Sequence, residues 1–179
     1  MSREPSPHFV AELPRLRETT ALGPAVDLAC GRGRHALALG AAGIPALGID
    51  RDAAALAELR DAARGLPAPV VGVRADLETP FGIPVRTGSC GAILVFCFLF
   101  RALAPAIEAA LAPGGLLVYE TFTRDQSSLG HGPRKPAFLL EPGELAKLFP
   151  GLEVLATWEG RTPGPHPDAL ARLTARRPR

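Results

Sequence analysis

The first candidate for chemistry in this sequence is a turn that contains two glycines near the start of the chain. The run Val26–His35 has the pattern of a short strand that ends at Gly31 and Gly33 and then opens into a helix. The first N–H groups of a helix have no partner within the helix and carry a partial positive charge, so they can hold the negative end of a ligand. Glycines let the ligand approach without a Cβ in the way. The pattern therefore predicts a ligand-binding turn.

Acidic residues accompany this turn and the two strand ends that follow it. Asp27 lies inside the first strand, Asp50 follows the second and precedes Arg51, and Asp76 follows the third. The glycine spacing, with Asp50 at the right distance to accept hydrogen bonds from ribose hydroxyls, also fits the loose dinucleotide fingerprint. The alternative is an ordinary strand-to-helix turn in which Asp50 only flanks a helix.

Strand-like and helix-like segments alternate along the chain. Strands are predicted at residues 25–29, 45–49, 70–73, 92–96 and 116–120, and helices at residues 34–42, 53–64, 104–111 and 143–149. Because parallel strands need crossover helices, this alternation predicts an α/β fold with a mostly parallel, doubly wound, Rossmann-like sheet. Two last strands, 152–158 and 169–175, are expected to form an antiparallel C-terminal hairpin that completes a seven-stranded sheet. Ligands bind at the carboxyl ends of strands in such folds, where the glycine turn lies.

The chain is expected to hold one domain with an added arm. Residues 1–22 are predicted to form an N-terminal helical arm, interrupted by Pro14, and residues 23–179 to form the domain. Residues 122–140 are rich in glycine, proline, serine and charge. Irregular loops of that length in compact domains are often functional, so we interpret this segment as a lid.

The composition excludes several classes of protein. The 179 residues carry a formal net charge of +2, which gives no strong basic field for binding nucleic acid. No stretch reaches the ~20 apolar residues of a membrane span, and the first residues lack the apolar core of a signal peptide. Cys30, Cys90 and Cys97 form no C-x-x-C pair, so neither a disulfide framework nor a metal site is expected. We expect a cytoplasmic protein, monomeric or homodimeric, without a membrane partner.

The run Asp27-Leu28-Ala29-Cys30-Gly31-Arg32-Gly33, together with Asp50-Arg51 and Asp76-Leu77, resembles the motifs of the class I S-adenosylmethionine-dependent methyltransferases. The resemblance covers about residues 25–121 and implies the fold of that class, with S-adenosyl-L-methionine as cofactor. It implies that Asp50 holds both ribose hydroxyls, that Arg51 packs on adenine, and that Asp76 and Leu77 read the adenine edge. It also implies that the first motif contributes Asp27, Ala29, Gly31 and Gly33 to the cofactor site.

The type of charge at the site supports the same cofactor. S-Adenosylmethionine carries a sulfonium cation, an ammonium and a carboxylate. Carboxylates beside a helix N-terminus complement this set of charges better than they complement a pyrophosphate, which needs an environment that favours anions. The charges therefore separate this cofactor from a dinucleotide.

The end of the fourth strand is expected on the acceptor side of the site. It reads Phe96-Cys97-Phe98 and lacks the Asn-Pro-Pro-Tyr type of signature that grips planar amino groups in DNA and many protein methyltransferases. Phe96 is a candidate to face the sulfonium through a cation–π contact, and the alternative is that these phenylalanines belong to the core. Cys97 is interpreted as an inert buried thiol and His35 as a surface residue, and the alternative for His35 is a role at the carboxylate of the cofactor.

The second half of the chain, over Gly132–Leu145, Trp158–Arg161 and the strand around Arg172, looks like the tellurite-resistance branch of the small-molecule methyltransferases. That resemblance implies methylation of a soft oxyanion such as tellurite, with arginine and histidine side chains near the acceptor. The candidates for catalysis or acceptor contact are Arg134, His131, Arg101 and Glu120, with Arg161 and His166 as further basic residues. The alternative for each arginine is a solvated surface charge.

These residues together predict an enzyme that transfers a methyl group from S-adenosylmethionine to a small-molecule acceptor. Three alternatives stay open. They are a catalytically silent cofactor-binding module or regulatory partner, an NAD(P)-dependent reductase, and a nucleic-acid or protein methyltransferase. The near-neutral charge disfavours a nucleic-acid partner.

Overall fold

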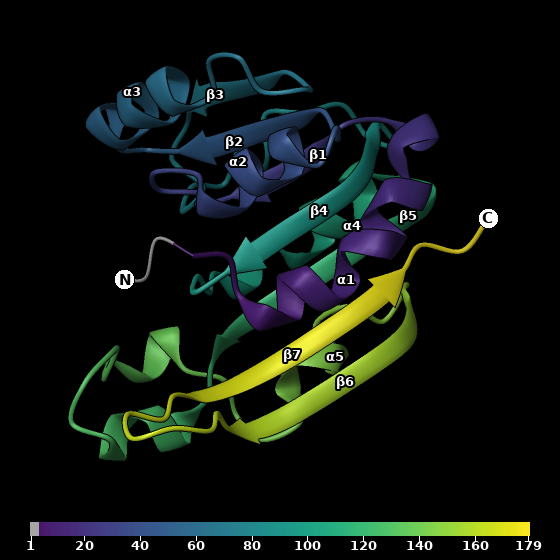
Figure 1. Ribbon diagram of the computed structural model, residues 1–179. Helices are drawn as coiled ribbons and strands as arrows, with labels where there is room; N and C mark the ends of the chain where they lie inside the picture. The colour runs from purple at the N-terminus through teal and green to yellow at the C-terminus, as the bar shows by residue number, and fades with distance from the viewer. Residues whose placement is uncertain (1–3) are drawn as a thin grey trace.

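The computed structural model describes residues 4–179 as a seven-stranded sheet with helices on both faces (Figure 1). The strands are β1 (Ala25–Leu28), β2 (Ala46–Asp50), β3 (Val70–Arg74), β4 (Cys90–Phe96), β5 (Leu111–Phe122), β6 (Glu153–Arg161) and β7 (Ala169–Arg176). The helices are α1 (Pro7–Glu18), α2 (Arg34–Ala41), α3 (Ala53–Ala62), α4 (Ala104–Ala110) and α5 (Glu144–Lys147). Residues 1–3 of the predicted arm lie outside the described residues.

The strand order is β3-β2-β1-β4-β5-β7-β6. Neighbouring strands pair in parallel from β3 to β5, and β7 runs antiparallel to both β5 and β6. The predicted seven-stranded, mostly parallel sheet with an antiparallel C-terminal hairpin is confirmed. From β1 the chain continues to β2 on one side, and from β4 it continues to β5 on the other side. The carboxyl ends of β1 and β4 therefore form the switch point where doubly wound folds bind ligands.

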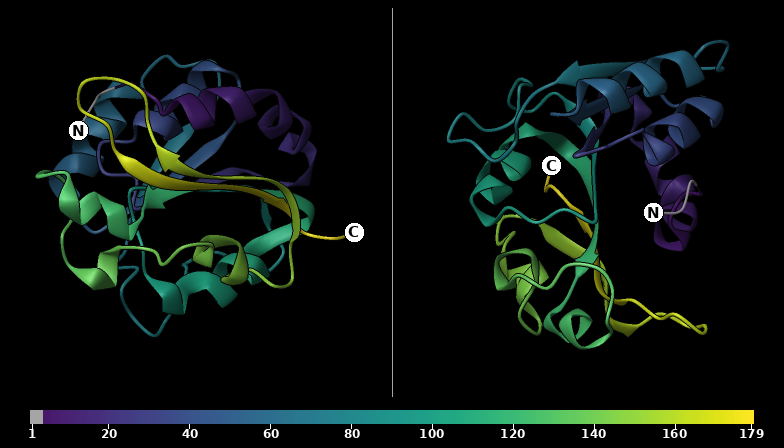
Figure 2. Two further views of the ribbon diagram at one scale, coloured as in Figure 1. Left: turned by 90° about the horizontal axis from the view of Figure 1, so that it is seen from below. Right: turned by 90° about the vertical axis from the view of Figure 1, so that its left-hand side faces the viewer.

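Helices cover the two faces of the sheet unequally (Figure 2). On one face α1, α2 and α3 bury Leu16, Leu39 and Leu59, and on the other face α4 and the α5 region bury Ile107 and Phe149. Strand β4 is buried along its whole length because both faces of the sheet are covered there. Its unbroken apolar sequence is the signature of such a central strand.

Helix α1 is continuous, so the predicted interruption at Pro14 is wrong. Ser6 caps the helix by accepting a hydrogen bond from the backbone N–H of His8 at 3.1 Å, and Pro7 occupies the first turn, where its missing N–H costs nothing. Pro14 removes the bond to the carbonyl of Val10, which lies on the exposed side of the helix. Water can satisfy that carbonyl, so the helix continues.

Several element boundaries differ from the sequence-based expectation because tertiary pairing extends or shortens them. β5 continues to Phe122 because β7 pairs with it as far as Leu170, and β6 reaches Arg161 for the same reason. α5 is only four residues long. β3 ends at Arg74, so Asp76 lies in the turn that follows the strand.

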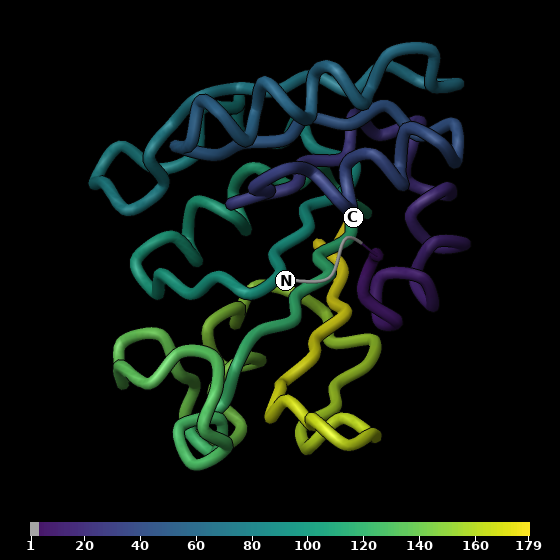
Figure 3. The backbone as a smooth tube through the Cα atoms, turned by 60° about the vertical axis from the view of Figure 1, so that its left-hand side comes forward, coloured from purple at the N-terminus to yellow at the C-terminus, as the bar shows by residue number. Residues whose placement is uncertain are grey.

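The predicted lid segment, residues 122–140, contains two short 3-10 turns and packs against the β6–β7 connection (Figure 3). Gln126 is fully buried and fastens the segment there. Its amide nitrogen donates to the His131 carbonyl at 3.1 Å and to Asp168 Oδ1 at 3.3 Å, and its amide oxygen accepts from Ala169 N–H at 2.7 Å. The segment is therefore held by specific polar contacts.

Within residues 4–179, no helix combines the length and apolar character that a bilayer crossing requires. The same residues contain no group of three or more His, Cys, Asp and Glu side chains placed to hold a metal ion. Cys30, Cys90 and Cys97 are free thiols.

A buried ion pair ties the last strand to the centre of the sheet. Arg172 Nε on β7 donates to Glu120 Oε2 on β5 at 2.7 Å, and the Ser6 hydroxyl donates to Glu120 Oε1 at 2.8 Å. The Glu120 side chain is 5% exposed, and the Arg172 guanidinium also lies 4.5 Å from the Trp158 ring centroid. Each oxygen of the buried carboxylate therefore has a partner.

We predict that Arg172→Met lowers the free energy of unfolding by about 3 kcal/mol, because the Glu120 charge stays buried without its guanidinium. Glu120→Gln in the Arg172→Met background is expected to restore part of this loss, since it removes the uncompensated charge. Urea unfolding of the two single variants and the double variant measures the coupling.

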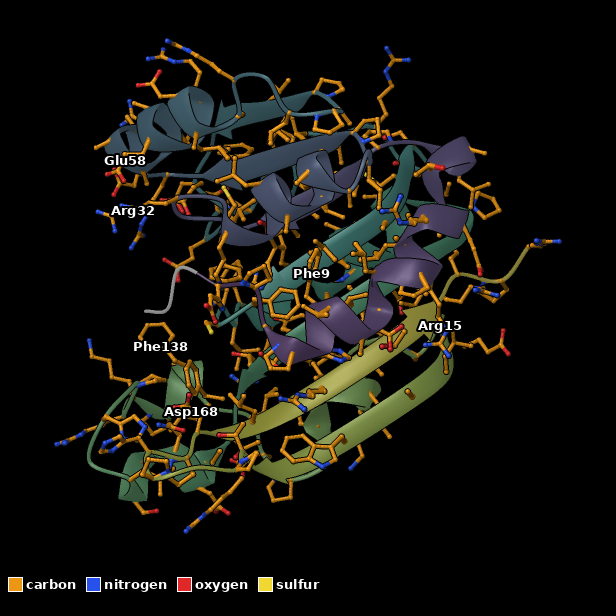
Figure 4. The ribbon with its side chains drawn as sticks, in the orientation of Figure 1. Phe9, Arg15, Arg32, Glu58, Phe138 and Asp168 are labelled. Atoms are coloured by element: carbon orange, nitrogen blue, oxygen red, sulfur yellow. The ribbon has the colours of Figure 1, made fainter. Side chains whose placement is uncertain are left out.

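Arg32→Met is the matched control because Arg32 pairs with Glu58 at 2.7 Å on the exposed surface (Figure 4). Breaking that pair is expected to cost less than about 1 kcal/mol. Equal losses at Arg32 and Arg172, or additive losses in the double variant, contradict the buried-pair interpretation.

Candidate functional site

A cavity of about 430 Å³ opens at the carboxyl ends of the central strands. This volume lies within the roughly 300–1,000 Å³ range of pockets that hold small molecules. Its lining comes from the ends of β1, β2, β4 and β5, the turn after β3, and the segment 122–140. The lining residues are Ala29, Asp50, Arg51, Ala75, Asp76, Leu77, Glu78, Cys97, Phe98, Leu99, Thr121, Phe122, Pro133 and Phe138.

The backbone reverses sharply where β1 and β4 enter the cavity. Ala29 and Cys97 have φ angles of 53° and 56°, and within residues 4–179 they are the non-glycine residues with positive φ. This conformation costs of order 1–3 kcal/mol for a residue with a Cβ, and such strain gathers at functional sites. Both residues line the cavity. The two strained positions therefore mark the switch point of the sheet.

The glycine turn shapes the start of α2 beside the cavity. Gly33 is the residue that precedes the helix and has a φ of 75°, and a Cβ there would lie 2.3 Å from Leu59 Cδ1. Gly31 has a φ of 54°, and its N–H donates to Asp50 Oδ2 at 2.7 Å. The turn after β1 is thus tied directly to the carboxylate at the end of β2.

The carboxylates at the ends of β2 and β3 are held by short local hydrogen bonds. Asp50 Oδ1 accepts from Asp52 N–H at 2.9 Å, and Asp76 Oδ1 accepts from Glu78 N–H at 2.9 Å. Arg51 pairs with Glu78 at 3.1 Å, which joins the two turns. The structure therefore brings five of the predicted cofactor residues to one cavity, and these are Ala29, Asp50, Arg51, Asp76 and Leu77.

Asp27 lies below the turn rather than on the cavity wall. Its side chain is buried and accepts the Ala36 N–H at 3.2 Å, so it supports the first turn of α2 from underneath. Burial raises the pKa of Asp27 to about 7, while the Ala36 N–H and the charge of Arg34 oppose the rise. Asp27 therefore acts on the cavity through the turn that it holds.

Two predictions at the end of β4 and the start of α2 need correction. Phe96 packs into the core under α1, where its ring centroid lies 3.9 Å from the ring centroid of His35. It does not line the cavity. His35 is 2% exposed and accepts the Ser6 N–H at Nε2 at 3.1 Å, so its interpretation as a surface residue is wrong. The alternation of the strand sends Phe96 to the face opposite the cavity.

The four candidates for acceptor contact do not line the cavity. Arg101 pairs with Glu144 and donates to the carbonyls of Ala137 and Leu139, which ties the 122–140 segment to α5. His131 Nε2 lies 3.1 Å from Asp168 Oδ1, and Arg134 donates to the Gly130 carbonyl at 3.0 Å. Glu120 is occupied by Arg172 and Ser6. Arg101, His131 and Glu120 therefore join segments that are distant in the sequence, whereas the contact of Arg134 is local and exposed.

The sequence interpretation expected the end of β4, Phe96-Cys97-Phe98, on the acceptor side of the site, but it did not choose as site residues the side chains that form the other side of the cavity. They come from β4, β5 and the 122–140 segment, and they are Cys97, Phe98, Thr121, Phe122, Pro133 and Phe138. Figure 4 shows Phe138 on the same side of the molecule as the end of β4. Successive side chains of β5 point to opposite faces of the sheet, and this alternation could have separated Thr121 from Glu120. The sequence carries no comparable signal that Pro133 and Phe138 line the cavity.

A sheet in this order, with a glycine turn after β1, a carboxylate inside β1 and carboxylates following β2 and β3, has the architecture of the class I S-adenosylmethionine-dependent methyltransferases. The methyltransferase domain family matches residues 26–119. The matched region includes the glycine turn, Asp50, Asp76 and Cys97. The chain belongs to this family, and it is an S-adenosylmethionine-dependent methyltransferase with S-adenosylmethionine as its cofactor.

Solved structures of low sequence identity share the fold. A methyltransferase from Methanosarcina mazei is 17% identical, with a TM-score of 0.72 over 92% of this chain and 97% of its own. TehB from Haemophilus influenzae is 17% identical, with a TM-score of 0.72 over 93% of this chain and 62% of its own. A protein studied for the conversion of a disulfide bond into a thioacetal group during echinomycin biosynthesis is 24% identical. Its TM-score is 0.70 over 98% of this chain and 82% of its own. No curated protein matches the sequence.

We predict that Asp27 makes the protein less stable as the pH rises from about 4 to about 7. Its pKa in the folded state is raised, so unfolding releases a proton in this interval, and stability that is fully present below about pH 4 is lost by about pH 7. The loss is about 1.4 kcal/mol for each pH unit between the Asp27 pKa in the unfolded chain, about 4, and its pKa in the folded protein, about 7. Asp27→Asn is expected to remove this part of the pH dependence.

Urea unfolding of the parent and of Asp27→Asn between pH 4 and pH 8 measures the difference. Asp61→Asn serves as control, because Asp61 is an exposed carboxylate paired with Arg64. Parallel stability curves for Asp27→Asn and the parent contradict the prediction.

Proposed function

We propose that this methyltransferase transfers the methyl group of S-adenosylmethionine to a small-molecule acceptor in the cavity at the carboxyl ends of β1–β5. The observation that carries the proposal is the composition of the cavity wall. Charged side chains line the wall near β2 and β3, and aromatic side chains line the wall near β4, β5 and the 122–140 segment. The first side suits the charged cofactor, and the second suits a small acceptor that has an apolar body.

The proposed cofactor side uses the residues predicted for it. Asp50 accepts hydrogen bonds from the ribose hydroxyls, Arg51 packs on adenine, and Asp76 with Leu77 reads the adenine edge. Their shared position at the cavity supports these roles. Asp27, Gly31 and Gly33 hold the turn that faces the amino-acid end of the cofactor. The carboxylates fit the positive charge of S-adenosylmethionine and would repel a pyrophosphate.

The protein itself needs to do little beyond alignment. S-Adenosylmethionine supplies a methyl group activated by its positively charged sulfur. The chain's own contribution is to place the acceptor in line with that methyl group and to keep water out. The rings of Phe98, Phe122 and Phe138 can exclude water from the acceptor side.

A soft acceptor fits this wall better than a hydrated oxyanion such as tellurite. The resemblance to the tellurite-resistance branch supports a soft acceptor. The side chains expected to bind an oxyanion, however, make contacts elsewhere, and these are Arg101, His131 and Arg134. A strongly hydrated oxyanion would lose its water against these rings without gaining hydrogen bonds in return, which is costly. The arm 1–22, the domain 23–179 with the lid 122–140, the cytoplasmic location and the monomeric or homodimeric state stay part of the proposal.

We predict that Asp50→Ala weakens the affinity for S-adenosylhomocysteine about 5- to 150-fold, because charge-assisted hydrogen bonds to the ribose are lost. Isothermal titration calorimetry measures the affinity. Asp61→Ala is the matched control, since it removes an exposed carboxylate away from the cavity. Unchanged affinity in Asp50→Ala removes Asp50 from the ribose role.

A thermal-shift comparison of S-adenosylhomocysteine with NADPH tests the site as a whole. A ligand that binds only the native state raises the unfolding temperature. Stabilisation by S-adenosylhomocysteine alone supports the proposed site, and stabilisation by NADPH alone contradicts it.

A further inference from the structure

The acceptor side of the cavity has a distinct chemistry. We define it as Cys97, Phe98, Thr121, Phe122, Pro133 and Phe138, all of which line the cavity. Three aromatic rings and a proline ring make this side apolar. The carboxylates that line the same cavity, Asp50, Asp76 and Glu78, lie at the ends of β2 and β3 on the cofactor side. An acceptor bound here therefore meets mainly ring surfaces.

Thr121 is the polar exception on the acceptor side. The residue is 1% exposed and lines the cavity, and its hydroxyl has no hydrogen-bond partner within residues 4–179. It lies beside Cys97, because the Cys97 N–H donates to the carbonyl of the preceding residue, Glu120, at 2.9 Å. Buried hydroxyls are normally paired, so an unpaired one at a cavity wall points to a ligand atom.

A positive charge lies next to Cys97, the neighbour of Thr121 on the cavity wall. Arg34 Nη2 lies 3.8 Å from Cys97 Sγ, and Arg34 Nη1 donates to the Glu4 carbonyl at 3.4 Å. Burial raises the pKa of the Cys97 thiol, so the thiol stays neutral and does not use up the guanidinium charge. The ends of β4 and β5 thus place an unpaired hydroxyl on the cavity wall and a cation in contact with Cys97, while Arg34 itself does not line the cavity.

We propose that the methyl acceptor is an organic thiolate with an apolar, ring-sized body, and that the Thr121 hydroxyl selects it by donating a hydrogen bond to its sulfur. This inference rests on the proposed function. The side chains on the acceptor side are rings, a thiol with a raised pKa and a hydroxyl, and none of them takes a proton readily at neutral pH. The nucleophile must therefore arrive already ionised, as a thiolate does more readily than an alcohol or a phenol.

The transfer step balances without a further reactant. The thiol gives its proton to solvent before it binds. A sulfur lone pair of the thiolate then forms the new S–CH₃ bond while the methyl–sulfonium bond breaks, and the electron pair of that bond stays on the cofactor sulfur. The products are a methyl thioether and S-adenosylhomocysteine.

The acceptor class is tested with compounds that share one ring and differ in the nucleophile. Thiophenol, phenol and aniline are offered to the full chain with S-adenosylmethionine, together with tellurite, and each rate is divided by the uncatalysed rate in the same buffer. We expect the enhancement for thiophenol to exceed those for the other three by at least about 100-fold. A larger enhancement for phenol, aniline or tellurite overturns the proposed acceptor class.

The role of Thr121 is tested by removing the hydroxyl without changing the shape. Thr121→Val is expected to raise the KM for thiophenol about tenfold, as the loss of one hydrogen bond to a charged atom implies. Thr121→Ser keeps the hydroxyl and is expected to stay within about threefold of the parent. Thr174→Val is the matched control, since the Thr174 hydroxyl is also buried and unpaired but lies on β7 away from the cavity.

Direct binding provides a readout apart from turnover. Thiophenol is titrated calorimetrically into the protein saturated with S-adenosylhomocysteine, and Thr121→Val is expected to weaken this binding about tenfold while the affinity for S-adenosylhomocysteine stays the same. Absence of thiophenol binding, or equal weakening by Thr121→Val and Thr174→Val, overturns the inference. If the parent protein does not bind S-adenosylhomocysteine, the proposed function is overturned instead.

Discussion

The reversal of the backbone at the carboxyl ends of β1 and β4 is the constraint on which the rest of the site depends. Ala29 and Cys97 both adopt left-handed conformations there, although each carries a Cβ. The sheet can impose this strain because the strands behind it are buried and paired on both sides. The reversal opens the space between two outward-turning chains, and every other feature of the cavity is arranged around that space.

The charged side of the cavity could be predicted from the sequence because its residues lie at strand ends or in the turns that follow them. Asp50 ends β2 and Asp76 lies two residues after the end of β3, and parallel strands bring such positions to one edge whatever the rest of the chain does. The glycine turn is equally local, since Gly33 needs its positive φ and leaves no room for a Cβ against Leu59. The fold class followed from the same alternation of strands and helices.

The acceptor side could not be predicted in the same way because distant segments form it. Arginines and histidines in residues 122–140 suggested a basic lid, but a charged side chain pairs with whichever partner the folded chain brings near. Arg101 meets Glu144, and His131 meets Asp168, through contacts between residues 37 or more positions apart. These pairs hold the segment against α5 and the β6–β7 connection, so the charge is used for structure while Pro133 and Phe138 reach the cavity.

Glu120 and Thr121 show how one strand separates structure from chemistry. They are neighbours on β5, and successive side chains of a strand point to opposite faces of the sheet. Glu120 therefore faces α1, where Ser6 and Arg172 satisfy its charge, and Thr121 faces the cavity with its hydroxyl unpaired. A carboxylate in the position of Thr121 would be a base on the cavity wall. The register of β5 instead places the charge in the core and leaves an uncharged donor at the site, so a nucleophile that already carries its own charge suits this cavity.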